Sequence, residues 1–210
     1  MDSMVSGRVP FWLKIGWSVW VAVWTPLYLQ YYGPSTFLWF CDFANFVILA
    51  ALWKESPLLL SWQAVSVLIF QTAYTLDILG RLVFRRHFIG GTEWVFDDPS
   101  TPLRIRLASV FMHLAAPPVL IWGIRRLGYD RRALRLQAAT AAILLPICWI
   151  GWDSTLNLNW VWKPFNKDQK WMAPPLYLLT CIAGYTALVF LPTHLLLARL
   201  FGKRAAPEKP

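Results

Sequence analysis

The stretch PLLLSWQAVSVLIFQTAYTLDILG, residues 57–80, decides the fold class of this chain. Asp77 is the only charged side chain in it. At about 1.5 Å per residue, a helix of this length can cross a hydrocarbon core of roughly 30 Å. The stretch therefore predicts a membrane-spanning helix.

Further apolar stretches on both sides of it predict an all-α, polytopic transmembrane helical bundle with six spans. The expected spans cover residues 15–32, 36–53, 57–80, 107–124, 136–152 and 173–198. The composition agrees, since 57% of the residues are apolar and only 15% are charged, against about a quarter in soluble domains. No Ser/Gly-rich or Pro-rich linker divides the chain, so we expect one membrane domain, 1–201, and a polar cytoplasmic tail, 202–210.

The basic residues predict the orientation. With a cytoplasmic N-terminus, twelve Lys and Arg residues lie in cytoplasmic segments and eight lie on the other side. This asymmetry favours cytoplasmic N- and C-termini (N-in/C-in) and places the two long loops, 81–106 and 153–172, outside. The absence of disulfide patterning and of eukaryotic sorting signals favours a bacterial inner (plasma) membrane.

The net charge of +9 does not predict a nucleic-acid partner, because the basic residues form short clusters between apolar runs. We expect membrane lipids as partners instead. Cys41, Cys148 and Cys181 lie within apolar stretches and lack CxxC spacing, so we expect no disulfide framework, no metal site and no cofactor. The motif GGTEWVFDD carries three carboxylates that could bind a divalent cation, but we expect a solvated acidic turn.

Polar side chains within the expected spans are costly in lipid and therefore mark candidate functional residues. Helical rise places Cys41 ~7–8 Å, His113 ~9 Å and Asp77 ~5 Å below the outer boundary. Three separate helices thus bring polar groups to one level. Asn45 shares a helix face with Cys41, whereas Asp42 points about 100° away. His194 lies near the inner end of the last span, away from this level.

This constellation predicts acyl transfer at the glycerol level of the outer leaflet. Cys41 is the expected nucleophile, with His113 as general base and then general acid. Asn45 would donate to an oxyanion, and either Asp77 or Asp42 would orient the imidazole. The alternatives are structural: an ion pair between Asp77 and Arg81, a core histidine bound to a carbonyl freed by Pro117 or Pro118, and Cys41 as a small buried apolar residue.

The segment NLNWVWKP, 157–164, predicts a site for a polar head group. It offers amide donors, an aromatic face and a cation in Asn157, Asn159, Trp160 and Lys163, and Arg81 adds a second cation that attracts phosphate. The alternative is an interfacial loop anchored by Trp160, Trp162 and Trp171.

Two stretches resemble a known family. WFCDFANF, 39–46, is similar to the L-C-D-x-A pattern in the second span of bacterial YwaF-type integral membrane proteins. NLNWVWKP followed by WMAPPLYLL, 171–179, resembles their N-Y-x-x-x-x-K-P segment and the G-P-W-P-W-Y block before the last span. Trp160 stands where the family has Tyr, and APPLY replaces the second block.

That family is related to androgen-induced hydrolases of lipid esters and to a phospholipid acyltransferase, which use a membrane-embedded Cys or Thr with a His from another helix. The resemblance therefore implies Cys41 as nucleophile, matched by motif, and His113 as its partner, matched by span order. We expect a lipid acyl hydrolase or acyltransferase. The alternatives are a non-catalytic lipid- or partner-binding membrane protein and a small transporter, which is disfavoured because the polar residues gather at one depth.

Overall fold

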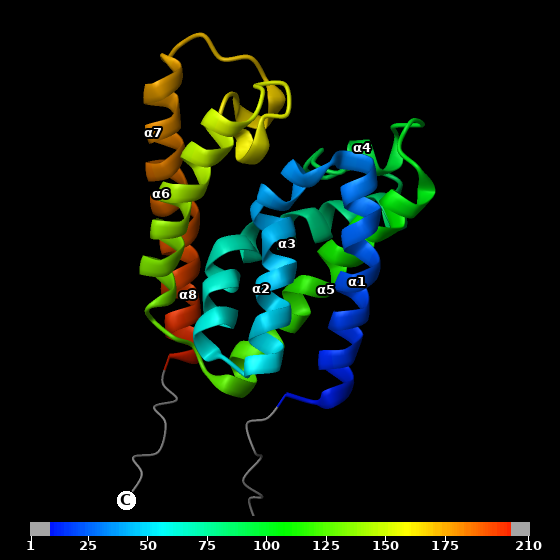
Figure 1. Ribbon diagram of the computed structural model, residues 1–210, viewed down its shortest axis with the longest axis vertical. Coiled ribbons are helices and arrows are strands. Elements are labelled where there is room, and N and C mark those ends of the chain that lie inside the picture. Colours follow the sequence, from blue (N-terminus) through cyan, green and yellow to red (C-terminus); the bar gives the residue numbers. More distant parts are fainter. Residues whose placement is uncertain (1–8, 203–210) are drawn as a thin grey trace, which may run out of the picture.

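The computed structural model describes residues 9–202, and these are helical apart from their connecting loops (Figure 1). Of the expected polar tail, residues 203–210 lie outside the described residues, as do the basic residues Arg8, Lys203, Arg204 and Lys209. The long helical elements are α1 (Phe11–Tyr32), α2 (Phe40–Lys54), α3 (Pro57–Phe84), α5 (Leu103–Leu127), α6 (Ala133–Gly151), α7 (Pro174–Gly184) and α8 (Leu191–Phe201). The short ones are η1 (Pro34–Leu38), α4 (Glu93–Phe96), η2 (Leu158–Trp160), η3 (Pro164–Asn166) and the π-helical η4 (Tyr185–Phe190).

Four of these helices are long and apolar enough to cross a membrane. They are α3, α5, α6 and the continuous run Pro174–Phe201, which joins α7, η4 and α8. α2 has only 15 residues, which corresponds to about 22 Å at the helical rise. α1 is long enough, but it is rich in Trp and Tyr, which are less apolar than aliphatic residues. A helix therefore occurs at each expected span, and four of them meet the requirements for a span.

Local sequence signals explain where α3 begins and ends. The Ser56 hydroxyl accepts a hydrogen bond from the N–H of Leu59 at 3.3 Å, and Pro57 occupies the first turn. Both features are typical of a helix N-terminus. The helix runs to Phe84, beyond the apolar stretch, and ends where Arg85 adopts a left-handed conformation with φ 56°.

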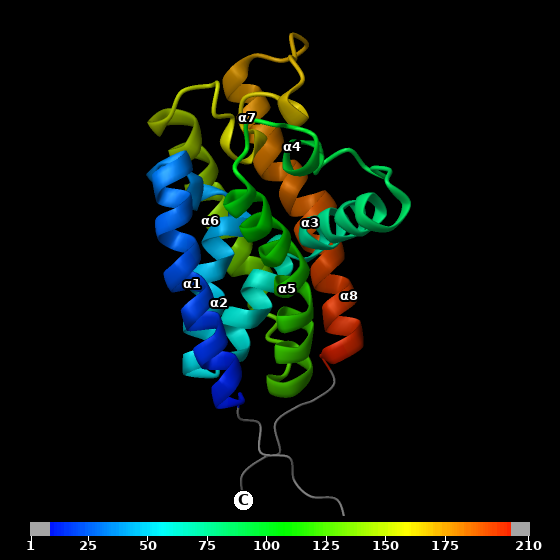
Figure 2. The ribbon, with the colours of Figure 1, turned by 90° about the vertical axis from the view of Figure 1, so that its right-hand side faces the viewer.

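The oblique helix α3 is the centre of the bundle, because it packs against α2, α5, α6 and α8 (Figure 2). The core between these helices is aliphatic and includes Ile48, Leu60 and Leu120, all fully buried. Gly123 allows α5 to approach α3 closely, since a Cβ at this position would lie 2.7 Å from a methyl carbon of Leu60. α1 packs against α2, η1 and α5. Its Trp24 ring contacts Phe46 of α2 and Phe37 of η1, and its Trp20 ring contacts Phe111 of α5.

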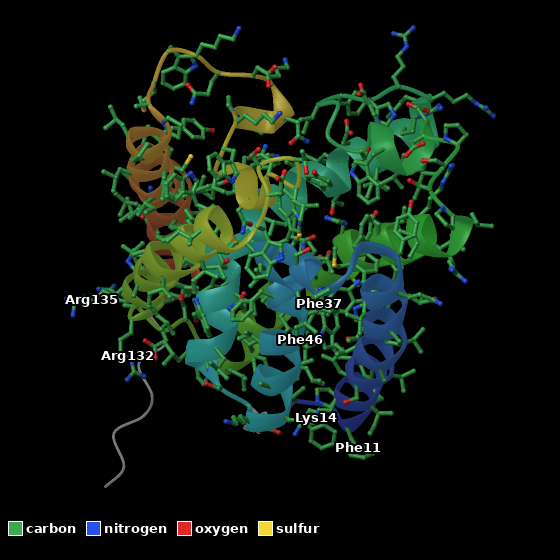
Figure 3. The ribbon with its side chains drawn as sticks, turned by 45° about the horizontal axis from the view of Figure 1, so that its top comes forward. Phe11, Lys14, Phe37, Phe46, Arg132 and Arg135 are labelled. Carbon is green, nitrogen blue, oxygen red and sulfur yellow. The ribbon has the colours of Figure 1, made fainter. Side chains whose placement is uncertain are left out.

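Both ends of the described chain lie at one end of the bundle, and the two long loops lie at the other (Figures 1 and 2). The end of the bundle where the described chain begins and ends also carries basic side chains, among them Lys14, Arg132 and Arg135 (Figure 3). Large apolar side chains point outward along the helices between the two ends; Val19, Ile143, Ile150 and Leu188 are more than half exposed. An apolar surface of this kind is characteristic of a membrane-embedded protein.

Candidate active site

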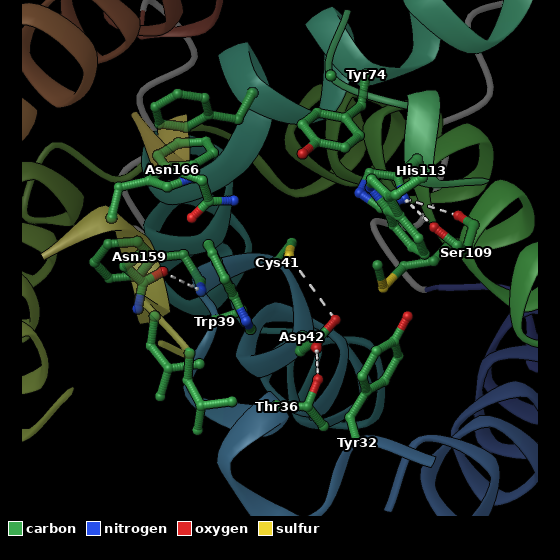
Figure 4. A pocket seen from close by; sticks show the side chains of 18 of the residues that line it. Tyr32, Thr36, Trp39, Cys41, Asp42, Tyr74, Ser109, His113, Asn159 and Asn166 are labelled. Atoms are coloured by element: carbon green, nitrogen blue, oxygen red, sulfur yellow. Dashed lines mark hydrogen bonds between the residues drawn. The ribbon is translucent and has the colours of Figure 1, made fainter. Parts of the chain in front are cut away.

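A cavity of about 740 Å³ lies at the loop end, bounded by α1, α2, α3, α5 and residues of both long loops. Phe, Tyr and Trp side chains form about a third of its lining. Three of the expected catalytic residues, Cys41, Asp42 and His113, line it (Figure 4). Of the three residues expected to converge, Cys41 and His113 therefore reach one cavity from two helices, whereas Asp77 does not line it.

Cys41 and Asp42 reach the cavity from the first turn of α2. Asn159 holds this helix start, because its Oδ1 accepts a hydrogen bond from the N–H of Phe40 at 3.0 Å and its Nδ2 donates to the Leu38 carbonyl at 2.8 Å. Asp42 is buried, and its Oδ2 accepts from the Thr36 hydroxyl at 2.7 Å. The Cys41 thiol donates to the other carboxylate oxygen of Asp42, at 3.8 Å. A carboxylate in the first helical turn is also favoured by the helix dipole.

His113 is held by its own helix and by α3. Its Nδ1 bonds to the Ser109 carbonyl at 2.8 Å, and its ring stacks on Tyr74, with centroids 4.7 Å apart. A carbonyl accepts only, so Nδ1 carries the proton and Nε2 is an acceptor in the neutral ring. The carbonyl that binds the ring is not one freed by a proline, contrary to the structural alternative. Pro117 instead frees the carbonyl of His113 itself, which accepts from the Thr75 hydroxyl at 2.7 Å.

The thiol and the imidazole share the cavity, but no hydrogen bond joins them. Within the described chain, Cys41 bonds to Asp42, and His113 bonds to Ser109. Figure 4 shows the Cys41 sulfur in the middle of the cavity, with Asn159 and Trp39 on one side and His113 on the other.

Asn45 does not line the cavity, so the prediction that it donates to an oxyanion is wrong. Its Nδ2 donates to the Cys41 carbonyl and to Met112 Sδ, both at 3.0 Å, and its Oδ1 accepts from Trp20 Nε1 at 2.9 Å. The residue lies one turn further along α2 than Cys41, between α1 and α5. Both polar atoms of its side chain therefore make hydrogen bonds within the bundle.

Asp77 organises the loop that follows α3 and also lies outside the cavity lining. Its Oδ1 accepts from the N–H groups of Ile89 and Gly90, at 2.7 and 3.2 Å, and its Oδ2 accepts from the N–H and hydroxyl of Thr92, at 3.0 and 2.6 Å. The predicted pairing of Asp77 with Arg81 is not formed. Arg81 instead pairs with Asp97 at 2.8 Å.

His87 links these two acids, and the sequence analysis missed it. Its Nδ1 lies 3.1 Å from Asp77 Oδ2, and its Nε2 lies 3.0 Å from Asp97 Oδ2. The only trace of this contact in the sequence is the equal spacing: Asp77 and Asp97 each lie ten residues from His87.

The expected head-group residues divide into two sets. Asn159 and Trp160 line the cavity, whereas Arg81, Asn157 and Lys163 do not. Asn157 is buried within its own loop, where it donates to the Lys163 carbonyl and to Asn166 Oδ1, each at 2.8 Å. Lys163 pairs with Asp168 at 3.2 Å. The two cations that were expected to attract phosphate therefore lie outside the cavity and are already paired.

The acidic motif, 90–98, contains the short helix α4 and ends in a hydrogen-bonded turn at the cavity edge. Asp98 accepts from the Ser100 hydroxyl and N–H and from the Thr101 hydroxyl, and these bonds lower its pKa. In the part of the chain that the structure describes, no group of three His, Cys, Asp or Glu side chains is arranged to hold a metal ion.

Several cavity residues carried no signal in the sequence, among them Gln71, Tyr74 and Ser109. They come from faces of α3 and α5 that become a cavity wall only when the helices pack. At the opposite end, His194 accepts from or donates to the Tyr129 hydroxyl at 2.7 Å, away from this site as expected.

No protein-family model, no curated protein and no solved structure matches this chain. The likeness to YwaF-type proteins therefore stays a prediction that depends on the short motifs around Cys41 and Asn157.

Proposed function

We propose that this protein is a six-span integral membrane protein, with both termini in the cytoplasm of a bacterium, that hydrolyses or transfers the acyl group of a lipid ester. One observation supports the activity most directly: Cys41, Asp42 and His113 from two helices line a single aromatic-rich cavity. The position of both ends of the described chain on one face and the outward apolar side chains support the membrane topology. The resemblance to YwaF-type proteins points to the same chemistry.

In the proposed reaction, His113 Nε2 takes the proton of the Cys41 thiol while the sulfur bonds to the ester carbonyl carbon. The alcohol oxygen then leaves with that proton, and a thioester remains on Cys41. Water, or the hydroxyl of an acceptor lipid, attacks the thioester next, with His113 again as base and then acid. The thiol is regenerated, and the product is a free acid or a new ester.

This mechanism requires Sγ and Nε2 to come within hydrogen-bond range when the substrate is bound. Catalytic hydrogen bonds are often long before substrate binds and tighten in the complex. We assign Asp42, not Asp77, as the acidic residue of the site, because Asp42 lines the cavity and Asp77 does not. We assign Tyr74 as the oxyanion donor in place of Asn45, because its hydroxyl points into the cavity (Figure 4).

The second candidate is a non-catalytic lipid-binding protein. It is favoured by the fact that the Cys41 thiol bonds to a carboxylate and not to the imidazole. The same cavity would then hold a lipid without cleaving it.

Acyl labelling tests the enzyme proposal. Purified protein is incubated with a p-nitrophenyl ester of an alkyne-tagged fatty acid, and hydroxylamine-sensitive label is measured. We expect label on the wild type, none on Cys41→Ala, and labelling about 10²–10⁴-fold slower on His113→Ala, because a general base contributes that factor. Cys181→Ala is the matched control, since this half-buried thiol bonds to the Trp160 carbonyl and does not line the cavity. Equal labelling of Cys41→Ala and wild type would leave only the binding function.

A further inference from the structure

Gln71 is a buried amide that faces the cavity without a partner. It lies on α3, one turn before Tyr74, and only 1% of its surface is exposed. Neither its Nε2 nor its Oε1 makes a hydrogen bond within the described chain, although Gln71 lines the cavity. Leaving a buried polar atom unpaired costs about 1–3 kcal/mol, so such atoms are rare and need an explanation. A ligand that supplies both an acceptor and a donor would satisfy this amide.

The charges around the cavity exclude an anionic ligand. The ionisable side chains of its lining include Asp42, Glu93 and Asp98, and no Lys or Arg of the described chain is among them. Arg81 and Lys163 lie elsewhere, paired with Asp97 and Asp168. A phosphate in this cavity would thus face carboxylates with no cation to balance its charge.

The same carboxylates are not placed to bind a cation. Asp42 is already bound by the Thr36 hydroxyl and the Cys41 thiol, and Asp98 by Ser100 and Thr101. Glu93 is exposed to solvent at the cavity edge. An ammonium group inside the cavity would therefore find aromatic rings, but no buried carboxylate oxygen that is free of a hydrogen bond.

We infer that the substrate is an uncharged acyl ester whose alcohol part carries hydroxyl groups, as in an acylglycerol, and that Gln71 binds that part. Gln71 Nε2 donates to a ligand oxygen, and Oε1 accepts from a ligand hydroxyl. The aromatic lining surrounds the acyl chain, which places the ester near Cys41. The ester itself rests on the proposed function, whereas the binding of an uncharged, hydroxyl-bearing lipid does not.

A competition assay in a Cys41→Ala background separates binding from catalysis. A diazirine-bearing alkylglycerol ether is cross-linked to the protein in detergent, and 1-O-dodecylglycerol, dodecyl phosphate and dodecyltrimethylammonium compete with it. We expect dodecylglycerol to compete at least tenfold better than either charged amphiphile. We also expect Gln71→Met to weaken dodecylglycerol binding about tenfold, which corresponds to one lost hydrogen bond to a buried group.

Gln63→Met is the matched control. Gln63 lies on the same helix and is also buried with both amide atoms unpaired, but it does not line the cavity. Its replacement should leave competition unchanged, and gel filtration checks that both variants remain folded. Stronger competition by dodecyl phosphate or by dodecyltrimethylammonium overturns the inference, as does unchanged binding in Gln71→Met. Selective binding of dodecylglycerol without any acyl labelling of the wild type would overturn the enzyme proposal alone.

Discussion

At the scale of single residues, Thr75 supplies a hydrogen bond that a proline beside the candidate active site cannot make. Pro117 has no N–H, so it cannot donate to the carbonyl of His113 one turn earlier in α5. The Thr75 hydroxyl supplies that bond at 2.7 Å. The bond joins α3 to α5 next to Tyr74, whose ring stacks on His113. One hydroxyl therefore helps to set the position of the imidazole.

We predict that Thr75→Val lowers the free energy of unfolding by about 1–2 kcal/mol, because it leaves a carbonyl in the bundle unpaired. In a Pro117→Ala background the N–H of residue 117 can bond to that carbonyl, so Thr75→Val should lower the free energy of unfolding by less. The measurement is a double-mutant cycle by denaturant unfolding in detergent. Thr72→Val, at an exposed position on the same helix, is the control and should be nearly neutral. An equal cost in both backgrounds would contradict this account.

Counting helical rise along the chain predicted the level shared by Cys41 and His113, because depth in a helix follows directly from residue number. It could not predict the partners of Asn45 and Asp77. Asn45 bonds to Trp20 and Met112, and Asp77 bonds to loop residues that lie ten or more positions later, from His87 onward. These contacts depend on how helices and loops pack, which the spacing along one helix does not contain.

At the scale of elements, the segment 85–102 lines one side of the cavity and is bonded to α3 at two places. Asp77 binds its backbone at Ile89, Gly90 and Thr92, and Asp97 binds Arg81 and His87. Gly90, Gly91 and Trp94 of this segment then line the cavity. The apolar stretches predicted the helices well because that signal is local. They predicted only a long loop here, since the order of this segment comes from an aspartate in α3.

The attachment at Asp97 should depend on pH. The hydrogen bond from Arg81 lowers the pKa of Asp97 below its ordinary value of 3.8, with a smaller contribution from His87. A carboxylate with a lowered pKa stabilises the folded state above its ordinary pKa, and this contribution is lost as the pH falls through the lower folded value. We therefore expect hydrogen–deuterium exchange in 85–102, corrected for intrinsic rates, to rise as the pH falls below about 4.

Asp97→Asn should show faster exchange in this segment near neutral pH and a weaker dependence on pH, while the bonds from Asp77 to Ile89, Gly90 and Thr92 remain. Asp168→Asn is the control, because Asp168 pairs with Lys163 in the other long loop. A wild-type pH profile in Asp97→Asn would show that this ion pair does not hold the segment.

At the scale of the whole molecule, the bundle has two unlike faces. One face carries both ends of the described chain and the basic residues Lys14, Arg132 and Arg135; the other carries the two long loops and the cavity (Figures 1 and 3). An even number of spans places both termini on one side, and the basic residues favour the cytoplasm for that side. The proposed substrate would then enter from the outer leaflet.

Cysteine labelling in intact bacterial cells tests this topology. In a variant that lacks Cys41, Cys148 and Cys181, single cysteines replace Gln30, Ser100 or Ser154, or Ser6 in the part of the chain that the structure does not describe. Gln30 is exposed at the loop end of α1, and Ser100 and Ser154 are exposed in the two long loops. We expect a membrane-impermeant maleimide to label Gln30→Cys, Ser100→Cys and Ser154→Cys in intact cells. Ser6→Cys should react only after permeabilisation.

Gln30→Cys carries the most information, because α1 and α2 are the two helices that fall short of the requirements for a span. At about 22 Å, α2 crosses the bilayer only if η1 and flanking side chains extend it or the bilayer thins locally. Labelling of Gln30→Cys in intact cells requires α1 to cross. Labelling only after permeabilisation would leave α1 and α2 on the inner side. Since α2 carries Cys41 and Asp42, the external cavity that the proposed chemistry requires would then not exist.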